Sequence, residues 1–171
     1  MEMNLSLTEQ LEVLANGGEL RPIDLAFAKF IASQNGSNDL SVLLAAAVSR
    51  TLGDKHSYLD LNQLPYWLKP MINCPNLAEQ LLASEVVTAE DSFKPMVLQQ
   101  KRLYLHKYWL YEHRLAAMLL ARANAKVSVD RDKIGSALDQ LFPSMDNSTG
   151  QPDWQKIAVA MALTKKLAVI S

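Results

Sequence analysis

The sequence is poor in residues that cross-link a fold or bind metal. It has one cysteine, Cys74, and three histidines, His56, His106 and His113. A single cysteine excludes an internal disulfide framework and suits a reducing cytoplasm. The four side chains are scattered, without the short spacings at which cysteine and histidine bind zinc. We therefore predict no metal site.

Long hydrophobic runs are also missing. No apolar stretch reaches the roughly 18 residues that a membrane-spanning helix needs. The first residues, MEMNLSLTEQLEVL, lack the basic start and apolar core of a secretory signal. These absences predict a cytoplasmic protein that has no membrane partner.

Neither sign of charge dominates the chain. It has 17 Lys and Arg against 18 Asp and Glu, a net charge of −1. This balance argues against a domain held to nucleic acid by bulk electrostatics. The charges are uneven along the chain, because residues 101–126 carry six bases against Glu112 alone, whereas residues 76–93 carry four acids and no base. Such runs are ordinarily the solvated faces of helices.

Aromatic side chains alternate with bases in the segment RLYLHKYWLYEHR, residues 102–114. Three interpretations stay open: the rings stack on nucleotide bases, they bind a protein partner, or they are core and hinge residues between a hairpin and a helix. In the first interpretation Lys101, Arg102 and Lys107 contact single-stranded nucleic acid.

A second aromatic group lies in a segment that prolines interrupt, residues 65–75. Tyr66, Trp67 and Met71 either form an exposed apolar patch that binds a partner or belong to the core. The motifs of common enzymes are absent, since the sequence contains no G-x-G-x-x-G, complete G-x-x-x-x-G-K-[ST], G-x-S-x-G or H-E-x-x-H. No catalytic residue is predicted.

Helix signals are clear in the first third of the chain. SLTE at 6–9 has the form of a capping box, and Gly17–Gly18 ends the helix that it opens. Pro22 begins a second helix that stops near residues 35–36. Residues 37–53 form a third helix that is apolar around most of its circumference. One face of the second helix is apolar, with Ile23, Ala26, Phe27, Phe30 and Ile31. Three helices joined by short loops indicate a small bundle.

The rest of the chain mixes short strands with helices. The expected elements are an edge strand near 58–61, a helix over 75–87, a hairpin of 96–98 and 103–105, a long helix over 108–125 and a helix that Pro143 ends. A linker-like segment over 144–153 follows. The last elements are a helix over 153–166, with Asp153 as its cap, and a strand over 167–171.

The final segment, DWQKIAVAMALTKKLAVIS, has the order of a nucleotide-binding unit: a capped helix with a glutamine near its start, a basic turn and a strand. In such units the strand leads directly into the Gly-rich phosphate loop, which here would begin after Ser171. The pattern therefore predicts the front part of a longer protein.

If the sequence is the front part of a longer protein, the apolar face of the helix over 153–166 lacks the sheet on which it would pack. This face contains Trp154, Ile157, Ala158 and Met161. Exposed apolar faces and unpaired strands invite association with another chain. We expect residues 154–171 to be disordered or buried in a self-association contact.

The chain resembles the RecD family, the alpha subunits of the bacterial helicase–nuclease exodeoxyribonuclease V (RecBCD). The matching segments, in order, are LRPIDLAFA, LAAAVS, LLAS, RLYLHKYWLYE and LFP…DWQKIAVAMALTKKLAVIS. The resemblance implies a mainly α fold. Residues 1–125 would be a helical bundle domain with a short β-hairpin that docks on the RecC subunit, and through the complex on RecB. Residues 126–171 would be the first helices and first strand of a truncated RecA-like α/β motor domain.

The resemblance also implies what the longer protein does. It would be a 5′–3′ DNA helicase of double-strand-break repair that uses ATP and Mg, and Gln155 would match the glutamine that contacts the adenine of ATP. The phosphate loop and every later motor motif are missing from this sequence, so we expect it to be non-catalytic, to hold no cofactor and to reach DNA only through the full motor. The alternative is a single-stranded nucleic-acid-binding module that uses residues 101–126.

Overall fold

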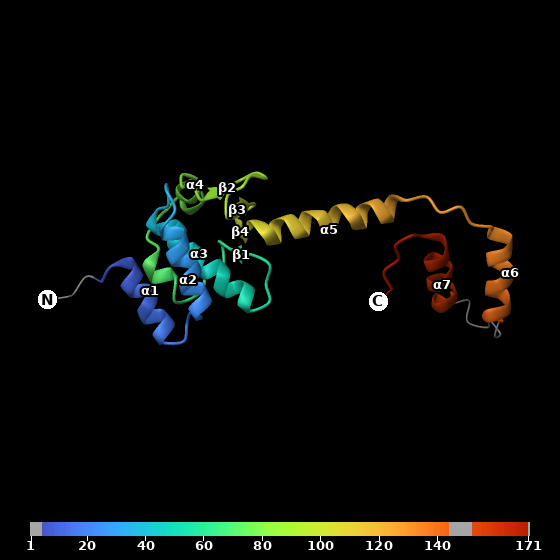
Figure 1. Cartoon of the computed structure of the whole chain (residues 1–171). Coiled ribbons are helices and arrows are strands. Elements are labelled where there is room, and N and C mark those ends of the chain that lie inside the picture. The colour runs from blue at the N-terminus through green and yellow to red at the C-terminus, as the bar shows by residue number, and fades with distance from the viewer. Residues whose placement is uncertain (1–4, 144–151, 171) are drawn as a thin grey trace. The chain divides into compact units, whose positions relative to one another are not determined.

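The computed structural model describes residues 5–143 and 152–170 (Figure 1). In these residues the chain is mainly helical, with seven α-helices and one four-stranded sheet. It divides into two compact units, residues 1–112 and 113–171. The division falls inside the long helix α5, whereas the boundary predicted at 125/126 lies just after that helix.

The first unit holds most of the elements. Its helices are α1 (Leu7–Asn16), α2 (Pro22–Ala32), α3 (Asp39–Gly53), the short 3-10 helix η1 (Lys69–Met71), α4 (Leu77–Leu82) and the start of α5 (His106–Asn124). Its strands are β1 (Leu59–Asp60), β2 (Val87–Thr88), β3 (Met96–Gln99) and β4 (Arg102–Leu105), in the order β1-β4-β3-β2. β2 and β3 are parallel, and the other pairs are antiparallel.

The predicted capping box is present. The Ser6 hydroxyl accepts a hydrogen bond from the Glu9 amide, and the Glu9 carboxylate accepts one from the Ser6 amide at 2.7 Å. The predicted helix over 75–87 is wrong at its end, because α4 stops at Leu82 and Val87 belongs to β2. Val87 pairs with Met96 of β3, and β-branched residues favour such extended pairing.

The predicted hairpin is confirmed although its turn lacks Asn-Gly. Gln100 and Lys101 both have positive φ, 50° and 62°, as the two-residue turn of a twisted hairpin requires. Alternate residues of β3 and β4 then point to opposite faces of the sheet. Met96, Leu98 and Leu103 pack in the main core with the helices, whereas Val97 and Tyr104 pack with Trp109 at the start of α5.

α3 lies at the centre of the main core, as its all-round apolar pattern predicts. Every residue from Ser41 to Ser49 is buried. α2 lies directly against it, and the side of α2 that is buried consists of Asp24, Ala28 and Ile31. The predicted apolar face of α2 therefore does not coincide with its buried side: of the five residues of that face, only Ile31 is buried.

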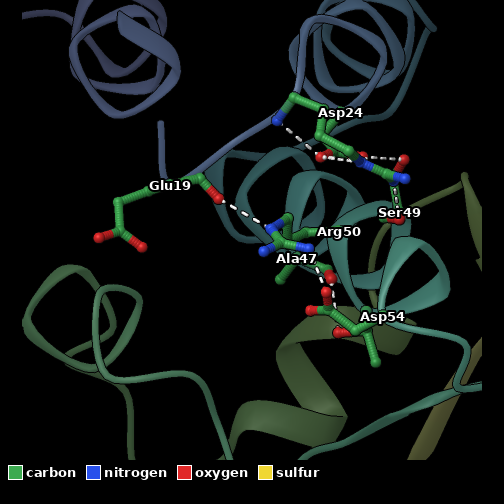
Figure 2. A network of polar contacts seen from close by, with 8 residues as sticks. Glu19, Asp24, Ala47, Ser49, Arg50 and Asp54 are labelled. Carbon is green, nitrogen blue, oxygen red and sulfur yellow. Dashed lines mark hydrogen bonds and ion pairs between the residues drawn. The ribbon is translucent and has the colours of Figure 1, made fainter. Parts of the chain in front are cut away.

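A buried carboxylate explains why a different side of α2 is buried than its apolar pattern predicts (Figure 2). Asp24 is fully buried, and its oxygens accept hydrogen bonds from the backbone amide of Arg21 at 2.8 Å, from the Arg21 guanidinium at 2.6 and 2.9 Å, and from the Ser49 hydroxyl at 2.6 Å. The same guanidinium donates to the Ser49 carbonyl at 2.6 Å. Because a buried carboxylate without partners is strongly destabilising, the buried Asp24 is stable only where α2 brings it to these donors, on the side that faces α3.

The network also ties the loop between α1 and α2 to α3. Arg50 donates to the Glu19 carbonyl at 3.0 Å and forms an ion pair with Asp54 (Figure 2). Burial alone would raise the pKa of Asp24, but the hydrogen bonds from Arg21 and Ser49 outweigh it and hold the pKa of this carboxyl below its usual value. Asp24 therefore stays ionised at neutral pH.

The second unit contains α6 (Arg131–Leu141) and α7 (Trp154–Thr164). Asp130 and Asp153 cap them, and Lys156 bonds Asp139 at 2.6 Å across the pair. The strand predicted over 167–171 is wrong for residues 167–170, which pair with no strand among the described residues and have no regular structure. The predicted linker lies outside the described residues over 144–151.

Substituting Gly53 tests how tightly Arg21 is held. A Cβ at this position would lie 2.1 Å from the Arg21 Nη1, so we expect Gly53→Ala to displace the guanidinium and to lower the free energy of unfolding by about 1–3 kcal/mol. Gly135 in α6 has nothing within 4 Å of the same position, so Gly135→Ala should be neutral or stabilising by up to about 1 kcal/mol. In an Arg21→Ala background the cost of Gly53→Ala should vanish; an unchanged cost would contradict the contact.

The Asp24 network predicts a pH-dependent stability. Because the folded-state pKa of Asp24 is lowered, its contribution is full above the unfolded pKa of about 3.9 and is lost as the pH falls towards the folded value. Asp24→Asn should cost roughly 2–4 kcal/mol at pH 7, and the gap to the unsubstituted chain should narrow below about pH 4. Denaturant titrations between pH 7 and pH 3 measure this gap, and a constant gap would exclude the ionised carboxylate as its cause.

Candidate docking surface

The described residues offer no metal centre. No group of three or more His, Cys, Asp or Glu side chains among them is placed to bind an ion. No described helix is both long and apolar enough to cross a membrane. The described helices do expose several large apolar side chains.

The three bases predicted to bind nucleic acid lie at the two ends of β4. Lys101 and Arg102 are neighbours at the hairpin turn, whereas Lys107 lies beyond the other end, in the first turn of α5. The Arg102 guanidinium lies 4.8 Å from the centre of the Tyr58 ring, and the Lys107 ammonium lies 5.6 Å from that of Tyr111. Both cations thus already face a tyrosine ring of this chain.

The aromatics of the same segment are mostly structural near the sheet. Tyr104 is buried, and burial, together with the nearby Glu112 carboxylate, raises the pKa of its phenol. Trp109 is buried and donates to the Gln99 side chain at 3.1 Å. Ser57 donates a hydrogen bond to Glu112. The hinge interpretation describes this part of the segment well.

The predicted patch of Tyr66, Trp67 and Met71 is divided by the structure. Trp67 is 9% exposed and belongs to the main core, and Met71 packs against that core. Tyr66 is 70% exposed, and its hydroxyl donates to the Glu19 carboxylate. The three residues therefore do not form one exposed apolar patch.

A larger apolar surface lies on the outer side of α2. We define the α2 outer face as Ile23, Ala26, Phe27 and Phe30, which recur at helical spacing. Ile23 is 62% exposed and Phe30 is 51% exposed, although both are large and apolar. The Phe27 and Phe30 rings stack with their centres 6.3 Å apart. The Asp24 network holds Ile23 and Phe30 towards solvent, while Phe27 packs partly against the main core. The Lys29–Glu12 ion pair at 2.6 Å connects this helix to α1.

α5 exposes a second apolar stripe in the second unit. Leu115, Met118 and Leu119 recur at i, i+3 and i+4, and all three are exposed. A helix of a globular protein ordinarily buries such a stripe.

The face predicted on α7 is formed by an ordered helix. Trp154 and Met161 are exposed, and with Ile157, Ala158 and residues 168–170 they line an apolar hollow of the second unit. The disordered alternative is therefore wrong for α7, whereas self-association remains a prediction. Gln155 also lines this hollow, and its backbone amide donates to the cap Asp153 at 3.0 Å.

Exposed apolar helix faces on a helical domain are typical of an interaction module. A family model described as "RecBCD enzyme subunit RecD, N-terminal domain" matches residues 16–104, more than half of the chain. The chain belongs to this family. The matched range contains the α2 outer face, strands β1 to β3 and all of β4 except Leu105.

Two curated relatives extend the match. The RecBCD enzyme subunit RecD of Buchnera aphidicola subsp. Acyrthosiphon pisum is 29% identical over 168 residues, which cover 88% of this chain and 26% of the relative. The RecBCD enzyme subunit RecD of Haemophilus influenzae is 26% identical over 194 residues, covering 95% of this chain and 29% of the relative. The chain thus spans less than a third of the length of these relatives.

The division of the aromatic patch predicts a contrast in stability. Trp67→Ala should lower the free energy of unfolding by about 3 kcal/mol, because it leaves a cavity in the main core. Tyr66→Ala should change it by less than about 0.5 kcal/mol, since this ring is mostly in water. Denaturant titration of the two variants measures the difference, and equal effects would show that Trp67 is not a core residue.

Proposed function

We propose that this chain is the domain by which a RecD-type helicase subunit docks on the RecC subunit of a RecBCD enzyme, and through it on RecB. The single observation that carries the proposal is the α2 outer face. A fixed polar network directs it towards solvent, and it lies inside the segment that the RecD N-terminal family model matches.

Exposing the α2 outer face is unfavourable for the chain on its own. Two large side chains, Ile23 and Phe30, stay more than half exposed while the same helix buries the carboxylate of Asp24. Burying an apolar side chain contributes roughly 1.5–3 kcal/mol, so a chain that folded for its own stability alone would bury these residues. A partner that covers the face recovers this energy, and aromatic side chains dominate the energetics of such contacts.

The longer protein is proposed to be an ATP-dependent 5′–3′ DNA helicase of double-strand-break repair that works in the cytoplasm. Residues from about 126 onward would lead into its RecA-like motor, where Gln155 would contact the adenine of ATP and Mg would accompany the phosphates. The residues present here would not catalyse the reaction. The names of the two relatives support this part of the proposal.

Single-stranded DNA binding by residues 101–126 is the competing function. The exposed Lys101, Arg102 and Lys107 would supply it, although two of these cations already face tyrosine rings. Titration of the chain with a labelled oligonucleotide at low and high salt checks it, because phosphate contacts give affinities that fall steeply with salt. If the docking proposal is right, the oligonucleotide shows no binding in this titration.

The docking proposal predicts the behaviour of α2 variants in size-exclusion chromatography with light scattering. The chain should elute with RecC from the same source as a one-to-one complex. Ile23→Ser and Phe30→Asp should each weaken this complex by roughly 30-fold or more, as loss of an interface hot spot of about 2 kcal/mol does. Thermal unfolding of the free variants should change little, because both positions are exposed.

A matched control lies in the second unit. Leu141, at the end of α6, is exposed to a similar degree as Ile23, and Leu141→Ser should leave the complex intact. Unchanged binding of both α2 variants would refute the role of the face. The mass of the chain alone, measured in the same runs, tests self-association through residues 154–171.

A further inference from the structure

The loop between β2 and β3, residues 89–95, exposes an apolar side chain and buries a polar one. Phe93 has a relative exposure of 108%, so the rest of the chain covers none of its ring. The neighbouring Ser92 turns inward, and its hydroxyl is buried without a hydrogen-bond partner among the described residues. A loop shaped by its own stability would place the phenyl ring inside and the hydroxyl in water. Sites that break such local rules are candidates for function.

The loop is held in this conformation at three points. The Glu90 amide donates to the Thr88 hydroxyl at 3.1 Å, and the Lys94 ammonium donates to the Val87 carbonyl at 3.0 Å. The Asp91 carboxylate bonds the His106 ring at 3.0 Å, which connects the loop to the start of α5. Phe93 is thus presented from a fixed loop, and a pre-ordered anchor loses little conformational entropy on binding.

The charge around Phe93 is acidic. Glu90 and Asp91 are exposed beside it, and the nearby base Lys94, which donates to the Val87 carbonyl, leaves the loop with a net charge of −1. A loop of this sign favours a basic protein surface over nucleic acid or an anionic membrane. A single exposed phenyl ring fits a small pocket rather than a flat apolar face.

We propose that Phe93 is an anchor residue that inserts into an apolar pocket of the partner subunit, and that Lys or Arg side chains at the edge of this pocket face Glu90 and Asp91. This inference rests on the docking function proposed above and adds a second contact, on the sheet side of the domain, with a defined partner chemistry. Aromatic anchors of this kind are characteristic hot spots of protein interfaces.

Calorimetric titration of the full chain with purified RecC tests the anchor. Phe93→Ala should weaken binding at least tenfold, and Phe93→Leu should recover part of the loss. Thermal unfolding should be unchanged for both variants, because the ring makes no contact within the chain. Glu90→Gln should weaken binding severalfold at low salt, and the difference should disappear at high salt, where the charges are screened.

The outcomes separate this inference from the docking proposal. If Phe93→Ala binds RecC like the unsubstituted chain while Phe30→Asp does not bind, the anchor is refuted and docking through α2 stands. If the unsubstituted chain does not bind RecC, both the anchor and the docking proposal are refuted. If Phe93→Ala instead abolishes a dimer of the chain alone and leaves RecC binding unchanged, the ring binds a second copy and the proposed partner is wrong.

Discussion

The orientation of α2 depends on one carboxylate. Asp24 is buried with four hydrogen-bond donors: the Arg21 backbone amide, the Nε and Nη2 of the Arg21 guanidinium, and the Ser49 hydroxyl. α2 is apolar on more than one side, so hydrophobic burial alone would not select the side that meets α3. The Asp24 network fixes that side, because its four hydrogen bonds form only where the carboxylate meets Arg21 and Ser49.

The consequence is a surface that has no role within the folded chain. With Asp24, Ala28 and Ile31 against α3, Ile23 and Phe30 of the α2 outer face point into solvent, while Phe27 packs partly against the main core. The loop between β2 and β3 is similar, because three hydrogen bonds hold it in the conformation that leaves Phe93 exposed. In both places polar contacts determine the backbone and leave apolar groups available to a partner, which is the division of roles that an interface requires.

The sequence predicted those elements whose signals are local. The capping box at Ser6, the all-round apolar pattern of α3, the hairpin and the cap at Asp153 each depend on neighbouring residues, and all are present. The outer face of α2 could not be predicted, because periodicity identifies an apolar face but not the side that is buried when an ionised residue competes for it. The error at residues 167–170 has a related cause, since a strand needs a hydrogen-bonded partner that its own sequence does not supply. Phe93 lies in the acidic run of residues 76–93, whose charge pattern predicts a solvated helix face and gives no signal for an exposed ring.

Side-chain footprinting by hydroxyl radicals, with and without RecC, tests the docking claim most directly. Oxidation of each aromatic and methionine side chain reports its contact with water in the intact chain. The structure predicts that RecC protects the exposed Phe30, while Tyr66, exposed on the same unit outside the α2 outer face, keeps its reactivity. Unchanged oxidation of Phe30 in a complex that does form would contradict docking through α2.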